Sequence, residues 1–138
     1  MLPAALYALL ELTLLSQAEP PLPFLSVSVV EGSTITLVAE SAALDGLRAS
    51  SLVGEYAGEL VPLAPGAPLD PYGCRYPTRV PAALVSARAW GNAMRLVNHA
   101  PRARANAAFE SVHHGGLLRV VIVATRDVAP GEQILADY

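Results

Sequence analysis

Residues 91–138 carry the most informative pattern in the chain and read GNAMRLVNHAPRARANAAFESVHHGGLLRVVIVATRDVAPGEQILADY. Within them, Leu118–Ala124 is an almost continuous apolar run, of the kind found in a fully buried strand. Asp127–Gly131 has the composition of a turn, and Gln133–Ala136 is expected to form a short closing strand. This end of the chain therefore predicts a β-rich fold built around one buried strand.

The pattern upstream also predicts strands. Phe24–Val30 and Thr34–Ala39 are rich in β-branched residues and flank a Glu-Gly-Ser turn, which favours a hairpin. Leu52–Val61 is expected to be one longer strand, and its two glycines suggest a bulge or a close approach by another backbone. Ala87–Val97 is expected to contain one or two short helical turns. Many short strands with few helices indicate an all-β or irregular β-rich domain.

The segments between these strands are expected to be irregular. Residues 40–51 form a loop of small residues, and the five prolines of residues 62–79 predict an irregular insert, bounded at 62–85. Cys74 is expected to be a free thiol in a loop. His113–His114 precede two glycines and are interpreted as a solvated hairpin loop, because two histidines alone do not make a closed zinc site.

The composition restricts the class of protein. A length of 138 residues fits one domain, and a hydrophobic content of 53% excludes intrinsic disorder. The single cysteine excludes a disulfide framework and any multi-cysteine zinc site. All nine basic residues are arginine, which excludes lysine-based nucleophilic or Schiff-base catalysis. The net charge of −3 gives no sign of direct nucleic-acid binding through bulk electrostatics.

Residues 1–23 combine an apolar run with a proline-rich connector. Residues 4–17 are expected to form a buried or edge-packed helix, since Glu11 interrupts the run and no basic residue precedes Arg48. The alternative for this segment is an uncleaved signal or a membrane anchor. We favour the packed helix and therefore expect no membrane association. The expected location is the nucleus or cytoplasm, or outside the cell if the apolar run acts as a signal.

A series of ordered residues from position 86 onward points to one family. The chain carries in sequence a Gly-Asn, an Arg-aliphatic-Asn-His segment, a single Asn, an Ala-x-Arg-Asp segment, a Gly-Glu and an Asp-Tyr. This order resembles the SET domain of protein-lysine methyltransferases, over about residues 34–138. The matching residues are Gly91-Asn92, Arg95–His99, Asn106, Ala124–Val128, Gly131-Glu132 and Asp137-Tyr138, with Gly54–Glu59 upstream.

The resemblance implies a particular fold. It implies a mainly β domain of the SET type (β-clip), with several small sheets, short helices and a C-terminal pseudoknot. The domain would occupy residues 24–138, with the insert at 62–85. It would be a minimal member that lacks the pre-SET and post-SET cysteine clusters, in agreement with the single cysteine.

The resemblance also implies an activity, which is methyl transfer from S-adenosyl-L-methionine to a lysine side chain of a protein. Tyr138 would be the catalytic-site tyrosine, and Tyr56 would line the channel for the target lysine. The cofactor would be bound by Asn98 and His99, with Arg95 anchoring it and no metal required. Ala39 falls where the family's cofactor loop is expected, and Tyr76 is a further candidate for the cofactor site or the channel wall.

Some positions depart from the family pattern and leave an alternative function open. Residues 38–40 contain no glycine where a glycine-rich cofactor loop is usual, Ala100-Pro101 replace a Ser-Cys, and Ala105 replaces a proline. With no post-SET segment after Tyr138, the channel would need another cover. The alternative is therefore a catalytically degenerate SET fold that acts as a protein-binding module. A histone tail is one candidate substrate, Glu55 and Glu59 could form an acidic groove for it, and a homodimer is compatible with the pattern.

Overall fold

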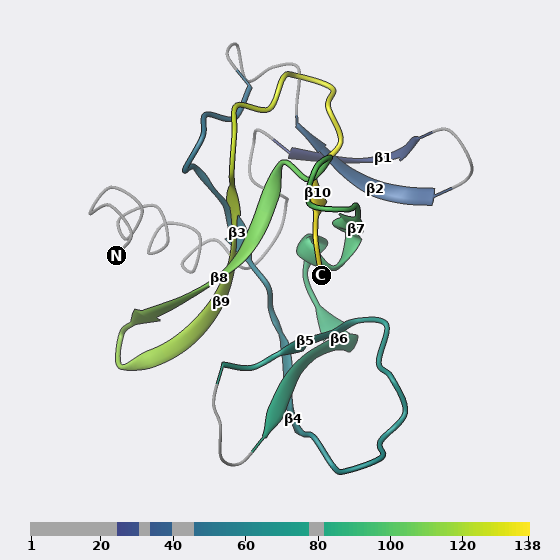
Figure 1. The fold of residues 1–138 in the computed structure, drawn as a ribbon, viewed down its shortest axis with the longest axis vertical. Helices are drawn as coiled ribbons and strands as arrows, with labels where there is room; N and C mark the ends of the chain where they lie inside the picture. The colour runs from purple at the N-terminus through teal and green to yellow at the C-terminus, as the bar shows by residue number, and fades with distance from the viewer. Residues whose placement is uncertain (1–24, 31–33, 40–45, 78–81) are drawn as a thin grey trace.

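The computed structural model describes residues 25–30, 34–39, 46–77 and 82–138, and Figure 1 shows them as three small sheets. The described part is mainly β, as expected, and its helical structure is a short 3-10 helix, η1, at Ala93–Leu96. The helix predicted at residues 4–17, the proline connector before Phe24 and the first half of the loop at 40–51 lie outside the described residues.

The first sheet is the predicted N-terminal hairpin. Strands β1 (Leu25–Val30) and β2 (Thr34–Ala39) pair in antiparallel fashion, from Leu25 opposite Ala39 to Val30 opposite Thr34. β2 also lies against η1, which brings Ala39's strand next to the segment that leads into Asn98. The hairpin prediction is confirmed.

The second sheet is the centre of the domain, with strands in the order β3-β9-β8-β10-β7. β8 (Ala107–His114) and β9 (Leu117–Ala124) form a hairpin around Gly115 and Gly116, whose φ values of 59° and 76° are those of the tight turns that favour glycine. The buried strand predicted at 118–124 is confirmed. His113 and His114 are the last residues of β8, not a loop, because the turn needs only the two glycines.

The position of β9 in the sheet explains why polar and apolar residues do not alternate in its sequence. Val120, Ile122 and Ala124 belong to the main hydrophobic core, whereas Val121 and Val123 belong to a second buried cluster with Leu52 and Val112. Successive side chains of a strand point to opposite faces of a sheet. Since both faces of β9 are covered, apolar residues occupy both sets of positions.

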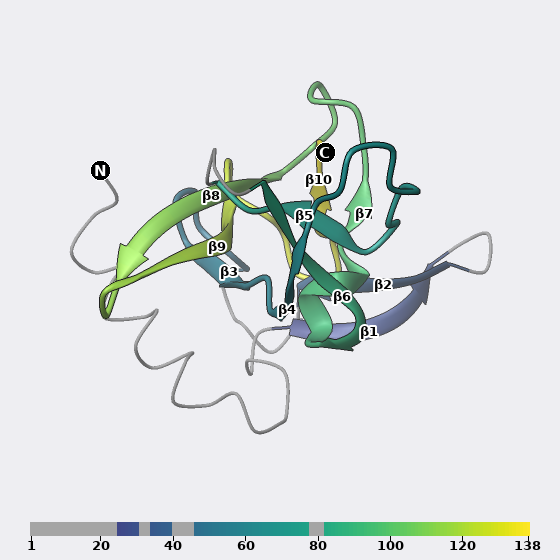
Figure 2. The ribbon, with the colours of Figure 1, turned by 90° about the horizontal axis from the view of Figure 1, so that it is seen from below.

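The C-terminal strand lies between two strands that precede it in sequence. β10 (Leu135–Ala136) pairs in parallel with β7 (Asn98–His99) on one side and with β8 on the other. The loop of residues 100–106, which joins β7 to β8, must therefore pass across β10, and Figure 2 shows the three strands in this order. This is the expected pseudoknot.

Asn106 holds this pseudoknot together. Its side chain is completely buried, and its amide nitrogen donates to Glu132 Oε1 (3.1 Å) and to the Gln133 carbonyl (2.8 Å). Its Oδ1 accepts the N–H of Leu135 at 2.8 Å. A buried amide is costly without partners, so these bonds both satisfy Asn106 and fix the C-terminal segment beside β8.

Glu132 extends the same network to the surface. It accepts hydrogen bonds from Arg126 Nη2 (2.6 Å), from the Ala129 N–H (2.9 Å) and from Asn106. The hydrogen bond from Arg126 is the main cause that lowers the pKa of the Glu132 carboxyl below its usual value, against some burial that raises it. The ionised carboxylate is thus favoured in the folded state.

This lowered pKa predicts a loss of stability in acid. A carboxyl whose pKa is depressed by folding stabilises the fold above its ordinary pKa of 4.5 and ceases to do so as the pH falls through the folded value. We expect Glu132→Gln to lower the free energy of unfolding at pH 7 by about 1–2 kcal/mol. Urea unfolding from pH 7 to pH 3 should show that the difference between variant and wild type shrinks below pH 4.5; a constant difference would contradict this role.

The third sheet, the insert sheet, is formed by β5 (Gly73–Arg75) within the insert and by β4 (Gly58–Pro62) and β6 (Ala83–Gly91) on either side of it. Two expectations about this part of the chain were wrong. Leu52–Val61 is not one strand: β3 (Leu52–Glu55) pairs with β9 in the central sheet, and β4 pairs with β6. The predicted close approach is confirmed at Gly58, where a Cβ atom would lie 2.4 Å from the Ser86 carbonyl oxygen. A side chain at this residue would therefore collide with the backbone of β6 where the chain enters the third sheet.

The insert at 62–85 is also more regular than its prolines suggested. β5 pairs with β6, and Cys74 thus lies in a strand, not a loop, and packs against the main core. β5 is an edge strand with prolines only outside it, which is where a sheet tolerates them. The segment 87–97 is a strand as far as Gly91, and its helical turn is confined to η1.

Candidate active site

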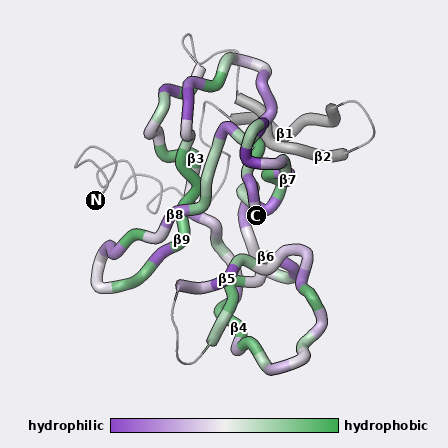
Figure 3. The backbone as a smooth tube through the Cα atoms, viewed as in Figure 1, coloured by the Kyte–Doolittle hydropathy of each residue, from purple (hydrophilic) through white to green (hydrophobic). Residues whose placement is uncertain are grey.

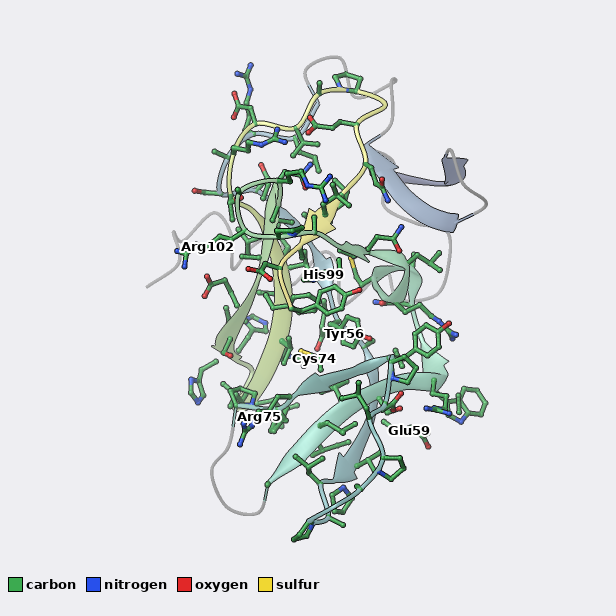
Figure 4. The ribbon with its side chains drawn as sticks, turned by 45° about the vertical axis from the view of Figure 1, so that its right-hand side comes forward. Tyr56, Glu59, Cys74, Arg75, His99 and Arg102 are labelled. Atoms are coloured by element: carbon green, nitrogen blue, oxygen red, sulfur yellow. The ribbon has the colours of Figure 1, made fainter. Side chains whose placement is uncertain are left out.

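A row of aromatic rings crosses the centre of the molecule between the central sheet and the insert sheet. His99 contacts Tyr138 (ring centroids 5.2 Å apart), Tyr138 contacts Phe109 (5.7 Å), and Phe109 contacts Tyr56 (5.5 Å), each edge to face. Figure 4 shows His99 and Tyr56 in the middle of the molecule, with Cys74 beside Tyr56. Four segments that are far apart in sequence thus meet in one aromatic row.

The pseudoknot explains this convergence. β10 places Ala136 level with His99 on β7 and with Ala107 on β8. Because both pairings are parallel, two residues further along the chain Tyr138 comes level with Phe109. Alternation along the strands sets Tyr138 and Phe109 on the same face.

Tyr138 is anchored at three points although 64% of it is exposed. Its hydroxyl donates to the Val97 carbonyl (3.2 Å), its backbone N–H donates to His99 Nδ1 (3.3 Å), and its ring touches Phe109. Partial burial raises the pKa of its phenol above the usual value. The side chain therefore remains a neutral phenol near neutral pH, with its oxygen beside the segment that precedes Asn98.

Tyr56 is the buried end of the row. It is 8% exposed, and its hydroxyl donates to the Tyr72 carbonyl of the insert at 2.7 Å. Burial is the largest cause that raises its pKa to about 12, followed by the nearby Cys74 thiol and Tyr138. Like Tyr138, it uses its proton on a backbone carbonyl, so its lone pairs are what it can offer to another group.

Asn98 lies between Val97 and His99, the two residues to which Tyr138 is hydrogen-bonded, and Arg95 lies just upstream of them. Asn98 is half-buried in β7, and no other described residue forms a hydrogen bond with its side-chain amide. Arg95, in η1, stacks its guanidinium on the Tyr72 ring at 4.5 Å and donates one N–H to the Arg88 carbonyl. η1 itself is fixed by Asn92, which caps it and donates to the Glu55 carbonyl at 2.8 Å.

A comparison with known protein families agrees with this geometry. A family model for the SET domain matches residues 27–138. The chain belongs to the SET-domain family. SET domains are in general protein-lysine methyltransferases. No curated protein sequence matches the chain.

Two other residues were predicted for the SET-domain site. Tyr76 packs against the main core, and its hydroxyl donates to the Leu118 carbonyl at 2.7 Å. Ala39 ends β2, which lies against η1, and the residues that follow it are outside the described part. Glu55, expected in an acidic groove, is instead paired with Arg119 at 3.0 Å, whereas Glu59 is exposed.

Phe109 is the site residue of this SET domain that the sequence did not reveal. It lies opposite Ile122 in the hairpin and joins Tyr56 to Tyr138. The strand containing it was not predicted, because AAFESVHH mixes apolar and polar residues without a clear period. The glycine pair at 115–116 was the usable signal, since pairing backward from it against Leu117–Ala124 gives β8 and the register of Phe109.

A surface hollow of about 440 Å³ lies beside the SET-domain site. Its floor is alanine from the start of β8 and the loop before it, and its walls include Arg102, Glu110, Thr125 and Asp137. Figure 4 shows Arg102 pointing away from the row of rings. Among the described residues, no cluster of histidine, cysteine and acidic side chains could hold a metal ion, and no helix could span a bilayer.

Proposed function

We propose that this SET domain transfers a methyl group from S-adenosyl-L-methionine to a lysine side chain of a protein. The observation that carries the proposal is the row formed by His99, Tyr138, Phe109 and Tyr56. It joins the Asn-His segment to two phenols whose own protons are bound by backbone carbonyls. Such a row provides apolar walls and directed oxygen lone pairs in the same place.

The residues around Asn98 suit the cofactor. The side-chain amide of Asn98 has no bond to other described residues, and an amide can both donate to and accept from a polar ligand. Arg95 donates only one N–H to a described residue, the bond to Arg88, so its remaining donors suit a carboxylate. When bound, S-adenosyl-L-methionine would supply a methyl group already activated by a sulfonium.

The chain's contribution is to select and orient a neutral amine. Apolar walls from Phe109 and the tyrosine rings disfavour the charged form of an entering lysine, so that its proton leaves to solvent. With a pKa of about 12, Tyr56 stays protonated at neutral pH and orients the amine through its lone pairs. Tyr138 lies at the other end, nearest Asn98 and His99, where the methyl group would enter. Orientation of this kind supplies much of an enzyme's rate.

Two variants separate cofactor binding from transfer. We expect Asn98→Ala to weaken S-adenosyl-L-methionine binding about tenfold in calorimetry, which corresponds to one hydrogen bond. Tyr56→Phe should leave that affinity unchanged and lower kcat on a panel of lysine peptides by about tenfold, since it removes the lone pairs that orient the amine. Tyr72→Phe is the matched control, because no described residue bonds its hydroxyl. A wild-type chain that binds no cofactor would overturn the proposal.

A binding function is the second candidate, and the insert sheet favours it. Leu60, Leu63, Leu69 and Trp90 are exposed, and Figure 3 shows hydrophobic residues along β4. These residues come from β4, from β6 and from the loop that follows β4, and exposed apolar residues in one region are typical of interaction surfaces. If calorimetry detects no cofactor binding while the chain is folded, this second function is favoured.

A further inference from the structure

The side chain of His99 contacts the C-terminal segment, and its backbone pairs with the same segment as part of β7. Ala136 lies level with His99 in the parallel pairing of β10 with β7. The backbone N–H of Tyr138 donates to His99 Nδ1 at 3.3 Å, and the two rings are edge to face at 72°. The Oδ1 atom of Asp137 is 4.0 Å from the same Nδ1.

From this geometry we propose that His99 is a positioning residue, which holds Tyr138 over the site through a neutral imidazole whose Nδ1 accepts the Tyr138 N–H. The inference rests on the proposed function, in which His99 contributes to cofactor binding, and adds a separate task for its side chain. It concerns a backbone group of Tyr138, so a change at His99 moves the phenol without removing any atom of it.

Because imidazole can gain a proton, the hydrogen bond between the Tyr138 N–H and His99 Nδ1 depends on the protonation state of the ring. A neutral ring has one donor nitrogen and one acceptor nitrogen, and here the acceptor must be Nδ1. A protonated ring carries a hydrogen on both nitrogens, so Nδ1 can no longer accept from Tyr138 and instead faces the Asp137 carboxylate. Among the residues that the structure describes, the titratable groups that contact His99 are Asp137 and Tyr138, both on the C-terminal segment.

Two substitutions separate the acceptor at Nδ1 from the rest of the ring. In His99→Asn, the amide oxygen occupies about the place of Nδ1 and still accepts the Tyr138 N–H without titrating. In His99→Gln, the amide reaches the place of Nε2 and leaves that N–H without its partner. We expect His99→Gln to lower kcat on the peptide panel on the order of tenfold, and His99→Asn to restore most of it.

The pH profile adds a readout that a merely structural role would not move. The wild-type rate should fall when the imidazole is protonated, because Nδ1 then carries a hydrogen and cannot accept the Tyr138 N–H. His99→Asn should lack this fall, because an amide does not gain a proton over this range. Cofactor affinity, measured by calorimetry at each pH, shows whether the effect lies in binding or in transfer.

A measurement that does not depend on methyl transfer distinguishes the positioning role of His99 from the proposed enzyme function. In the full chain labelled with ¹³C-tyrosine, the signal absent from Tyr138→Phe identifies the Tyr138 ring by NMR. We expect that signal to shift with pH in the wild type and to be constant over the same range in His99→Asn. A Tyr138 ring signal that changes neither with pH nor in His99→Gln would overturn the positioning role. If the signal responds as expected but no methyl transfer occurs, the positioning role stands and the proposed enzyme function fails.

Discussion

Replacing Tyr138 with phenylalanine is expected to reduce kcat for methyl transfer by about 100-fold, the usual effect of removing one prearranged polar group from a reaction centre. The hydroxyl is fixed by its bond to the Val97 carbonyl, and partial burial keeps it protonated, so its oxygen needs no reorganisation when the methyl group arrives. The affinity for S-adenosyl-L-methionine should change little, because the ring and its contact with His99 remain. Labelled cofactor and a lysine peptide panel measure the rate, and calorimetry measures the affinity.

The control for this variant is again Tyr72→Phe, which removes one phenolic hydroxyl and keeps the ring. Tyr138→Phe should lose about 0.5–1.5 kcal/mol of stability with its hydrogen bond, too little to unfold a domain. Urea unfolding of both variants checks this. If Tyr138→Phe retained the wild-type kcat, the Tyr138 oxygen would have no part in transfer, and the proposed mechanism would be wrong.

Replacing Asn106 with alanine is expected to have the largest effect on stability, a loss of about 3–5 kcal/mol in the free energy of unfolding. Each buried group left without a partner costs about 1–3 kcal/mol, and this change removes the Asn106 bonds to the Leu135 N–H, the Gln133 carbonyl and the Glu132 carboxylate. The C-terminal segment should then separate from β8. Hydrogen exchange at Leu135 and equilibrium urea unfolding measure the local and the global effect.

Asn98→Ala is the matched control, since it removes the same side chain from a half-buried position without a described partner. The two variants should show opposite behaviour, with stability lost in Asn106→Ala and cofactor affinity lost in Asn98→Ala. Equal stability losses would mean that the pseudoknot does not depend on the Asn106 bonds.

Much of the fold follows from local sequence, and what was missed depends on contacts between distant segments. The N-terminal hairpin and β9 could be predicted because β-branched runs and turns define them locally. The break between β3 and β4 could not, because it depends on Ser86 lying against Gly58. β5 was missed since its three residues are a strand only through pairing with β6.

The candidate site, too, could be predicted only in part, because it depends on contacts between distant segments. The order of Asn98, His99 and Tyr138 in the sequence allowed them to be named as one site, and the pseudoknot places His99 against Tyr138. Phe109 was missed because its place depends on the register of a strand with no clear period. Tyr76 stays a prediction, and the bond from its hydroxyl to the Leu118 carbonyl on β9 is a contact that no local pattern predicts.

The intercalated position of β10 has a consequence for biosynthesis. Residues 135–138 emerge from the ribosome after every other strand of the central sheet, yet they occupy the gap between two of them. A nascent chain can form the β8–β9 hairpin early, because its contacts are local, but the space beside it stays empty until synthesis reaches Ala136. The aromatic contacts that join His99 to Tyr138 and Tyr138 to Phe109 can form only once β10 has entered this gap.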